Sequence, residues 1–196
     1  HTATPPLDPA VLAVMEPCIA AAFGNPSSLY RLGQEARAAV DTARSQAAAV
    51  LGCAPGEILF TSGATESNNL ALRGVAWAAR LAAPGNHPPH IVTTAIEHHA
   101  VLHTAESLAL QGFRVTFVQP DHKGIVSAAA IANAIEPDTC LVAVMLANNE
   151  MGAIQPVAEI AAIAQERGVP LHTDAVQGAG LLSLNVEHLG VDLMAL

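Results

Sequence analysis

Positive charge is scarce in this 196-residue chain, which has eight lysine and arginine residues against seventeen aspartate and glutamate residues. The formal net charge is −9 with histidine neutral. A nucleic-acid-binding surface needs clustered lysine and arginine, and an anionic membrane surface attracts the same residues. The charge balance therefore argues against both kinds of partner.

Long apolar runs are also missing, although 52% of the residues are hydrophobic. A membrane-spanning helix requires roughly 18 or more consecutive apolar residues. The longest candidates here, such as residues 141–147, have only the length of a buried strand. Length and composition together suit one domain, or most of one, with a sizeable core.

Cysteine and lysine are rare as well. Cys18, Cys53 and Cys140 are spaced too irregularly for a disulfide framework or a zinc site. We expect them to be small buried side chains in a reduced, cytoplasmic compartment. Lys123 is the only lysine, and the Asp-His-Lys-Gly sequence around it predicts a polar turn between a strand and a helix.

The rest of the chain alternates between helical and strand patterns. Helices are predicted over residues 32–51 (with Gly52 as a stop), 64–81 (ended by the turn at 84–86), 99–110 and 127–135, and from Pro156 onward. Strands are predicted over residues 57–61, 90–95, 113–118, 139–146, 169–174 and 191–196. This alternation predicts an α/β fold, a mostly parallel sheet with helices on both faces in three layers. The start at His1 and the strand at the end suggest a piece of a longer polypeptide.

Ligands of such sheets bind beyond the carboxyl ends of the strands, so polar residues at these ends are candidate site residues. The first candidate segment is residues 61–69, where small residues start a helix. Backbone N–H groups, the helix dipole and the Thr65 hydroxyl can together bind a phosphate there. An ordinary helix N-cap, with Glu66 favouring the first turn, is the alternative.

The second candidate segment is residues 96–100, with Glu97 and His98 between a strand and a helix. An imidazole at this place can stack on a flat aromatic ligand or move protons near neutral pH. Two alternatives remain open: a metal site in which His99, His103 and Glu106 share one helix face, and solvated histidines without a role.

Two further segments carry polar groups at strand ends. Residues 148–152 place two amides and a carboxylate before Gly152, which fits either a ligand rim or a tight polar turn. Residues 171–177 place His172 and Asp174 on one face of a strand. A carboxylate at the end of an apolar strand needs a cation or donors, such as a protonated pyridine nitrogen. A His-x-Asp metal pair and a capping aspartate are the alternatives.

Five motifs resemble those of the cysteine desulfurases, in the same order and at similar spacing, and the resemblance spans nearly the whole chain. The branch that it resembles most is the nitrogen-fixation and iron–sulfur housekeeping type. The motifs are Phe23-Gly24-Asn25-Pro26-Ser27-Ser28, residues 60–67, Glu97-His98, residues 148–152 and residues 172–177.

The resemblance implies the large domain of a fold-type I enzyme that uses pyridoxal 5′-phosphate. Such an enzyme converts L-cysteine to L-alanine and passes the sulfur to one of its own cysteines as a persulfide. It further implies a homodimer and a sulfur-acceptor protein such as an iron–sulfur scaffold. The implied site residues are Ala64 and Thr65 at the phosphate, His98 stacked on the ring and assisting proton transfer, Asn149 near the ring oxygen O3′ and the substrate, Asp174 at the ring nitrogen, and Gln177 at the phenolic oxygen.

The resemblance also implies functional groups that this chain lacks. The lysine that holds the cofactor, the nucleophilic cysteine and the substrate-binding arginine would follow Leu196. Residues 1–15, which begin with the family's opening segment, would pack with a small domain whose remainder is absent, and residues 16–196 would form the first part of the cofactor-binding domain.

Three other hypotheses remain. The first is a related class V enzyme, such as a selenocysteine lyase or cysteine lyase. The second is a non-catalytic truncated homologue that serves as a binding or assembly subunit. The third is a metal hydrolase built on His99, His103, His172 and Asp174.

Overall fold

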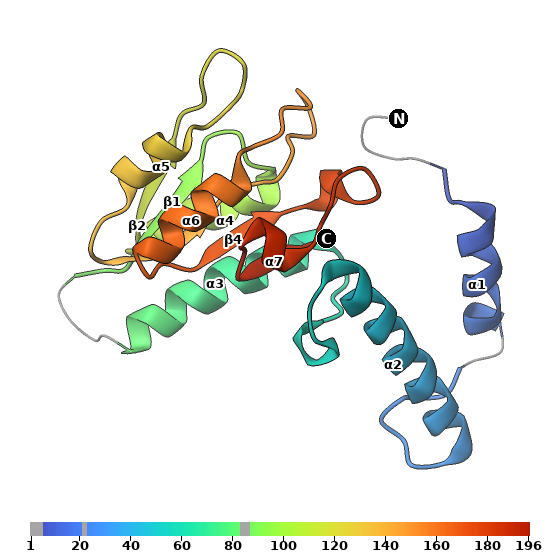
Figure 1. Cartoon of the computed structure of the whole chain (residues 1–196). Helices are drawn as coiled ribbons and strands as arrows, with labels where there is room; N and C mark the ends of the chain where they lie inside the picture. The colour runs from blue at the N-terminus through green and yellow to red at the C-terminus, as the bar shows by residue number, and fades with distance from the viewer. Residues whose placement is uncertain (1–5, 21–22, 83–86) are drawn as a thin grey trace. The chain divides into compact units, whose positions relative to one another are not determined.

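The computed structural model describes residues 6–20, 23–82 and 87–196 (Figure 1). The chain forms two compact units, one that ends at Leu59 and one that covers Phe60–Leu196. The family-like opening segment at residues 1–4 and the turn predicted at residues 84–86 lie outside the described residues.

The first unit is helical. It contains α1 (Pro9–Ala20), α2 (Arg31–Leu51) and the short 3₁₀ helix η1 (Pro55–Glu57). The prediction for α2 is confirmed, and Gly52 ends it in the left-handed conformation with φ 71°. No helix was predicted at α1, although Asp8 caps it by accepting from the N–H of Ala10 at 2.7 Å and Pro9 starts it.

The prediction of a strand over residues 57–61 is wrong. Glu57 ends η1, and residues 58–60 are irregular, with Leu59 67% exposed. The backbone carbonyl of Ile58 accepts from the Arg44 guanidinium instead of from a neighbouring strand. The apolar pattern therefore marked a connecting segment and not a sheet strand.

The second unit contains a five-stranded, entirely parallel sheet in the order β2-β1-β3-β4-β5. This confirms the predicted architecture. The strands are β1 (His90–Thr94), β2 (Arg114–Val118), β3 (Thr139–Ala143), β4 (Leu171–Asp174) and β5 (Leu193–Ala195). Beyond β3, the N–H groups of Val144 and Leu146 still donate to the carbonyls of His172 and Asp174, so pairing with β4 continues for the predicted length.

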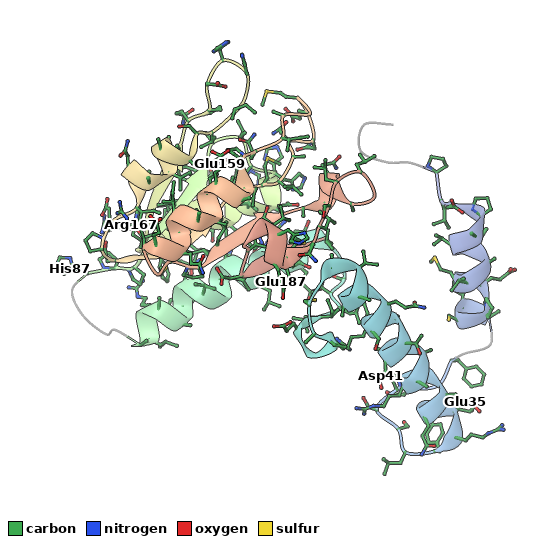
Figure 2. All side chains as sticks on the ribbon, viewed as in Figure 1. Glu35, Asp41, His87, Glu159, Arg167 and Glu187 are labelled. Carbon is green, nitrogen blue, oxygen red and sulfur yellow. The ribbon has the colours of Figure 1, made fainter. Side chains whose placement is uncertain are left out.

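Helices cover both faces of this sheet (Figure 1). One layer holds α3 (Ala64–Ala82) and α4 (His99–Leu110), which pack on each other and on the strands. The connection from β1 to β2 runs one way across the sheet, and the connections from β2 to β3, β3 to β4 and β4 to β5 run the opposite way. Because crossovers between parallel strands are right-handed, these three connections place their helices on the face opposite α4. The helices are α5 (Ala128–Ala134), α6 (Val157–Glu166) and α7 (Val186–Leu189). Glu159, Arg167 and Glu187 are exposed on the outside of this second layer (Figure 2).

The core lies between the sheet and the α3–α4 layer. Its fully buried side chains include Leu72, Ile91, Val101, Leu108 and Leu141. None of the helices in the described part of the chain combines the length and apolarity needed to cross a membrane.

The prediction that the cysteines are buried is wrong for Cys18. This residue is exposed and lies on α1, a helix that has no buried residues in this structure. Cys53 and Cys140 are half-buried. Burial raises the pKa of the Cys140 thiol to about 11, so this side chain is not an activated thiolate at neutral pH.

Candidate active site

The strand order reverses between β1 and β3, because the chain passes from β1 outward to β2 and then back across to β3. In sheets of this order, ligands bind outside the carboxyl ends of the strands at this point. The segments that leave β1, β3 and β4 are residues 95–98, 144–149 and 175–177. Four of the predicted site residues, His98, Asn149, Asp174 and Gln177, lie at these exits.

Asp174 is the last residue of β4 and is only 6% exposed. Its Oδ2 accepts a hydrogen bond from Nδ2 of Asn68 at 2.7 Å, and its Oδ1 accepts from the N–H of Val176 at 3.2 Å. Within the described residues, no lysine, arginine or histidine forms an ion pair with it. A buried carboxylate without a cation is costly, so this position suits a ligand that presents a positively charged N–H.

The N-terminus of α3 faces the same region. Ala64 is half-buried and Thr65 is exposed. Thr65 precedes Asn68 by three residues, so both lie on one side of α3, about 4.5 Å apart along the helix axis. Since Asn68 contacts Asp174, the helix start lies one turn from the carboxylate. One small molecule can therefore reach both groups.

The start of α3 also keeps its capping contacts. Oε2 of Glu66 accepts from both the N–H and the hydroxyl of Ser62, at 2.6 Å each, and these bonds lower the pKa of Glu66. The first N–H groups of the helix itself have no carbonyl partner within the helix, and the helix dipole adds partial positive charge. The capping interpretation and the anion-binding interpretation are thus compatible.

Glu97, between β1 and α4, is buried. Its Oε1 accepts from the Thr94 hydroxyl at 2.7 Å and from the N–H of Met145 at 2.8 Å, while Oε2 has no partner among the described residues. Burial raises the pKa of Glu97 to about 8, and the nearby charge of Asp174 adds to this effect. The side chain is therefore mostly a neutral acid at pH 7, and it ties the exit of β1 to the exit of β3.

His98 is the N-cap residue of α4 and is exposed. Its Nδ1 accepts from the N–H of Ala100 at 3.1 Å, so this nitrogen carries no proton in that arrangement. The backbone contact fixes the position of the ring at the strand exit while leaving it accessible. This placement fits an aromatic ring that stacks on a flat ligand.

Neither metal hypothesis finds a complete ligand set among the described residues. His99 and His103 stack on each other with ring centroids 4.8 Å apart, as their spacing on α4 predicted. However, the described residues contain no group of three or more histidine, cysteine, aspartate or glutamate side chains that could hold a metal ion. His172, a member of the hypothetical hydrolase site, is 1% exposed, and neither ring nitrogen has a partner in the part of the chain that is described.

The two neighbouring asparagines have different environments. Asn148 is buried; its Nδ2 donates to the carbonyl of Ile96 at 2.8 Å, and its Oδ1 accepts from the N–H groups of Glu150 and Met151. It therefore holds the turn together and connects it to the β1 exit. Asn149 is half-buried beside it. Gln177 is also half-buried, in the 3₁₀ helix η2 (Val176–Gly178) that follows Asp174.

Two residues of this site received no role from the sequence. Asn68 lies on the buried side of α3 with Leu72 and Ala76, at intervals of four residues. A polar residue on such an apolar stripe was the signal that could have found it. Glu97 stands out in the sequence only as part of the Glu97-His98 motif, and no local pattern indicates that its side chain is buried.

The chain is similar to known proteins over its whole length. The family model for class-V aminotransferases matches residues 1–196. The chain is 46% identical over 196 residues to the cysteine desulfurase IscS of Methanosarcina thermophila, and 46% identical over 195 residues to the cysteine desulfurase of Mus musculus. The alignments cover 100% and 99% of this chain but 47% and 41% of those proteins. The chain thus spans about half the length of the curated relatives it matches.

Two solved structures are similar over 98% of this chain. One is described as SspA in complex with cysteine, with a TM-score of 0.92 and 38% identity, and 54% of that chain is covered. The other is described as a NifS-like protein, with a TM-score of 0.92 and 39% identity, and 52% of that chain is covered.

Proposed function

Because the chain belongs to the class-V aminotransferase family, we propose that the protein of which it is part is a pyridoxal-phosphate-dependent cysteine desulfurase. The enzyme would convert L-cysteine to L-alanine and transfer the sulfur to one of its own cysteines as a persulfide. The observation that carries the proposal is the buried Asp174 carboxylate, which pairs with no cation among the described residues and lies one turn from the start of α3.

Asp174 is the group that selects the cofactor. Its carboxylate would pair with the protonated nitrogen of the pyridine ring, which supplies the positive charge that this buried position needs. When bound, pyridoxal phosphate supplies an electron sink for the bond cleavages at the substrate. The carboxylate would keep the ring nitrogen protonated and would thereby maintain that sink.

The other residues would bind and orient the ring. Ala64 and Thr65 would bind the phosphate through the start of α3, His98 would stack on the ring and move a proton, and Asn149 and Gln177 would contact its oxygen side. The exposure of Thr65 and His98 and the half-burial of Ala64, Asn149 and Gln177 support these roles, since each side chain is accessible at the site.

The proposal needs a lysine and a nucleophilic cysteine from the remainder of the protein. Lys123 lies in an exposed turn, as predicted, where its N–H donates to Oδ1 of Asp121 at 2.8 Å. Cys140 keeps its proton at neutral pH. Neither residue fits the missing role.

Several further expectations belong to this proposal. They are a homodimer, a sulfur-acceptor protein such as an iron–sulfur scaffold, a cytoplasmic location, and packing of residues 1–15 with a small domain. The free state of Cys18, Cys53 and Cys140 supports a reducing compartment.

The test uses the complete polypeptide purified with pyridoxal phosphate. We expect bound cofactor with visible absorption that changes when L-cysteine is added, and equal amounts of alanine and sulfide in the presence of a thiol reductant. Asp174→Asn should lose most of this activity, whereas Asp121→Asn, in an exposed turn, should retain it. A complete protein that binds no cofactor, or that releases no alanine from cysteine, would refute the proposal.

A further inference from the structure

A side chain from α3 orients the carboxylate of Asp174. Its Oδ2 accepts from Nδ2 of Asn68 at 2.7 Å, across a sequence separation of 106 residues. The N–H of Val176 holds the other oxygen. A carboxylate held at both oxygens cannot rotate freely about its last bond, so its remaining lone pairs point in fixed directions.

Asn68 has no other use that the structure shows. It is fully buried, and its Oδ1 has no hydrogen-bond partner among the described residues. Buried amides in purely structural positions usually satisfy both ends, because an unpartnered buried polar atom costs stability. Here the acceptor is idle and the donor is committed to Asp174. This cost indicates that the contact with the carboxylate is what the position provides.

We propose that Asn68 is a positioning residue that holds the Asp174 carboxylate in line with the pyridine nitrogen of the cofactor. The inference rests on the proposed function. It adds a mechanical link: α3 would bind the phosphate through Thr65 and, one turn later, orient the carboxylate at the opposite end of the ring. The two ends of the cofactor would thus be held at a distance set by a single helix.

The main test variant is Asn68→Leu, which keeps the size of the side chain and removes the donor. The complete protein is loaded with pyridoxal phosphate labelled with ¹⁵N in the ring, and the pyridine ¹⁵N signal is followed by solid-state NMR as a function of pH. We expect the ring nitrogen to lose its proton at least about one pH unit lower than in the wild type, which corresponds to tenfold weaker retention of the proton. We also expect kcat to fall about tenfold with little change in KM for cysteine.

Two controls separate positioning from structural damage. Asn133→Asp changes an exposed asparagine on α5 and should leave the ¹⁵N titration unchanged. Asn68→Ser keeps a shorter hydroxyl donor and should titrate between the wild type and Asn68→Leu. If Asn68→Leu does not fold, Asn68→Ser alone decides the question by the same measurement.

The possible failures are distinguishable. A wild-type protein that binds no pyridoxal phosphate refutes the proposed function. A wild-type protein that binds it and produces alanine, together with Asn68 variants whose ring nitrogen titrates as in the wild type, refutes only the role of Asn68. Lower thermal stability without a shift in the titration would mean that Asn68 is structural, and would overturn the inference.

Discussion

The backbone N–H of Met145 donates to Oε1 of Glu97 at 2.8 Å, so one buried carboxyl spans the two strands between which the strand order reverses. The hydroxyl of Thr94 donates to the same oxygen at 2.7 Å. His98 follows Glu97 directly and Asn149 lies four residues after Met145. This contact therefore links the two segments that carry these candidate site residues.

Glu97→Gln should make the stability of the folded protein less sensitive to rising pH. The pKa of about 8 in the folded protein lies above the usual glutamate pKa of 4.5, so the folded state binds the proton more tightly than the unfolded state does. The stabilisation from this proton is fully present below pH 4.5 and is lost as the pH rises toward 8. Glutamine has the shape of the neutral acid and does not ionise, so the variant should avoid this loss, which is on the order of a few kcal/mol.

Thermal unfolding of the cofactor-free protein at pH 5 and pH 8 measures this effect. Glu106→Gln, on the exposed face of α4, is the matched control and should follow the wild type. An equal loss of melting temperature in the wild type and Glu97→Gln would show that the carboxyl is not buried as a neutral acid.

His98→Asn should separate the two roles of this residue. Asparagine is a good N-cap residue and preserves the contact with the N–H of Ala100. The cofactor-free protein should therefore keep its stability within about 0.5 kcal/mol. The ring that would stack and move a proton is lost, so the rate of alanine formation should fall by about 100-fold or more. A variant with nearly full activity would contradict the role of His98.

The pair Asn148 and Asn149 allows a comparison of neighbouring positions. Asn148→Ala removes one donor and one acceptor that together make three hydrogen bonds to the backbone, so we expect a loss of stability of about 2 kcal/mol or more. Asn149→Ala should change stability little but weaken cofactor or substrate binding. Urea unfolding of the cofactor-free proteins measures the loss of stability, and cofactor titration measures the loss of binding. A stable Asn148→Ala variant together with a destabilised Asn149→Ala variant would contradict these two roles.

His172→Phe should reduce the sensitivity of the protein to acid. Burial lowers the pKa of His172 from 6.5 to about 4, so the folded state keeps this ring neutral while the unfolded state takes up a proton. Stability is therefore lost as the pH falls from 6.5 toward 4, by about 3 kcal/mol in total. Phenylalanine fills similar space and cannot be protonated.

Melting temperatures at pH 7 and pH 4.5 test this prediction. The difference between the two pH values should be smaller for His172→Phe than for the wild type, whereas His99→Gln, at an exposed position, should not change it. A wild-type difference that persists in His172→Phe would assign the acid sensitivity to other groups.

The local sequence pattern was sufficient to predict most helices and strands of the second unit. Helix α4 has the predicted bounds, and α3 and β1 end within one residue of theirs. It failed at residues 57–61, where a short apolar run pairs with no strand in the described part of the chain. It also failed at α1, where only the Asp-Pro start indicated a helix. Periodicity reports which side of an element is apolar, but a short apolar run does not show whether a partner exists to cover it.

The order of polar residues at the strand ends, and hence the likeness to the cysteine desulfurases, was determined by the sequence alone. This was possible because motifs and periodicities are properties of neighbouring residues. Only the tertiary structure decided that Asn68 reaches Asp174 and that the carboxyl of Glu97 joins β1 to the chain leaving β3. Such contacts depend on how helices and strands pack over long sequence separations, and burial, which sets the charge of Glu97 and His172, follows from that packing.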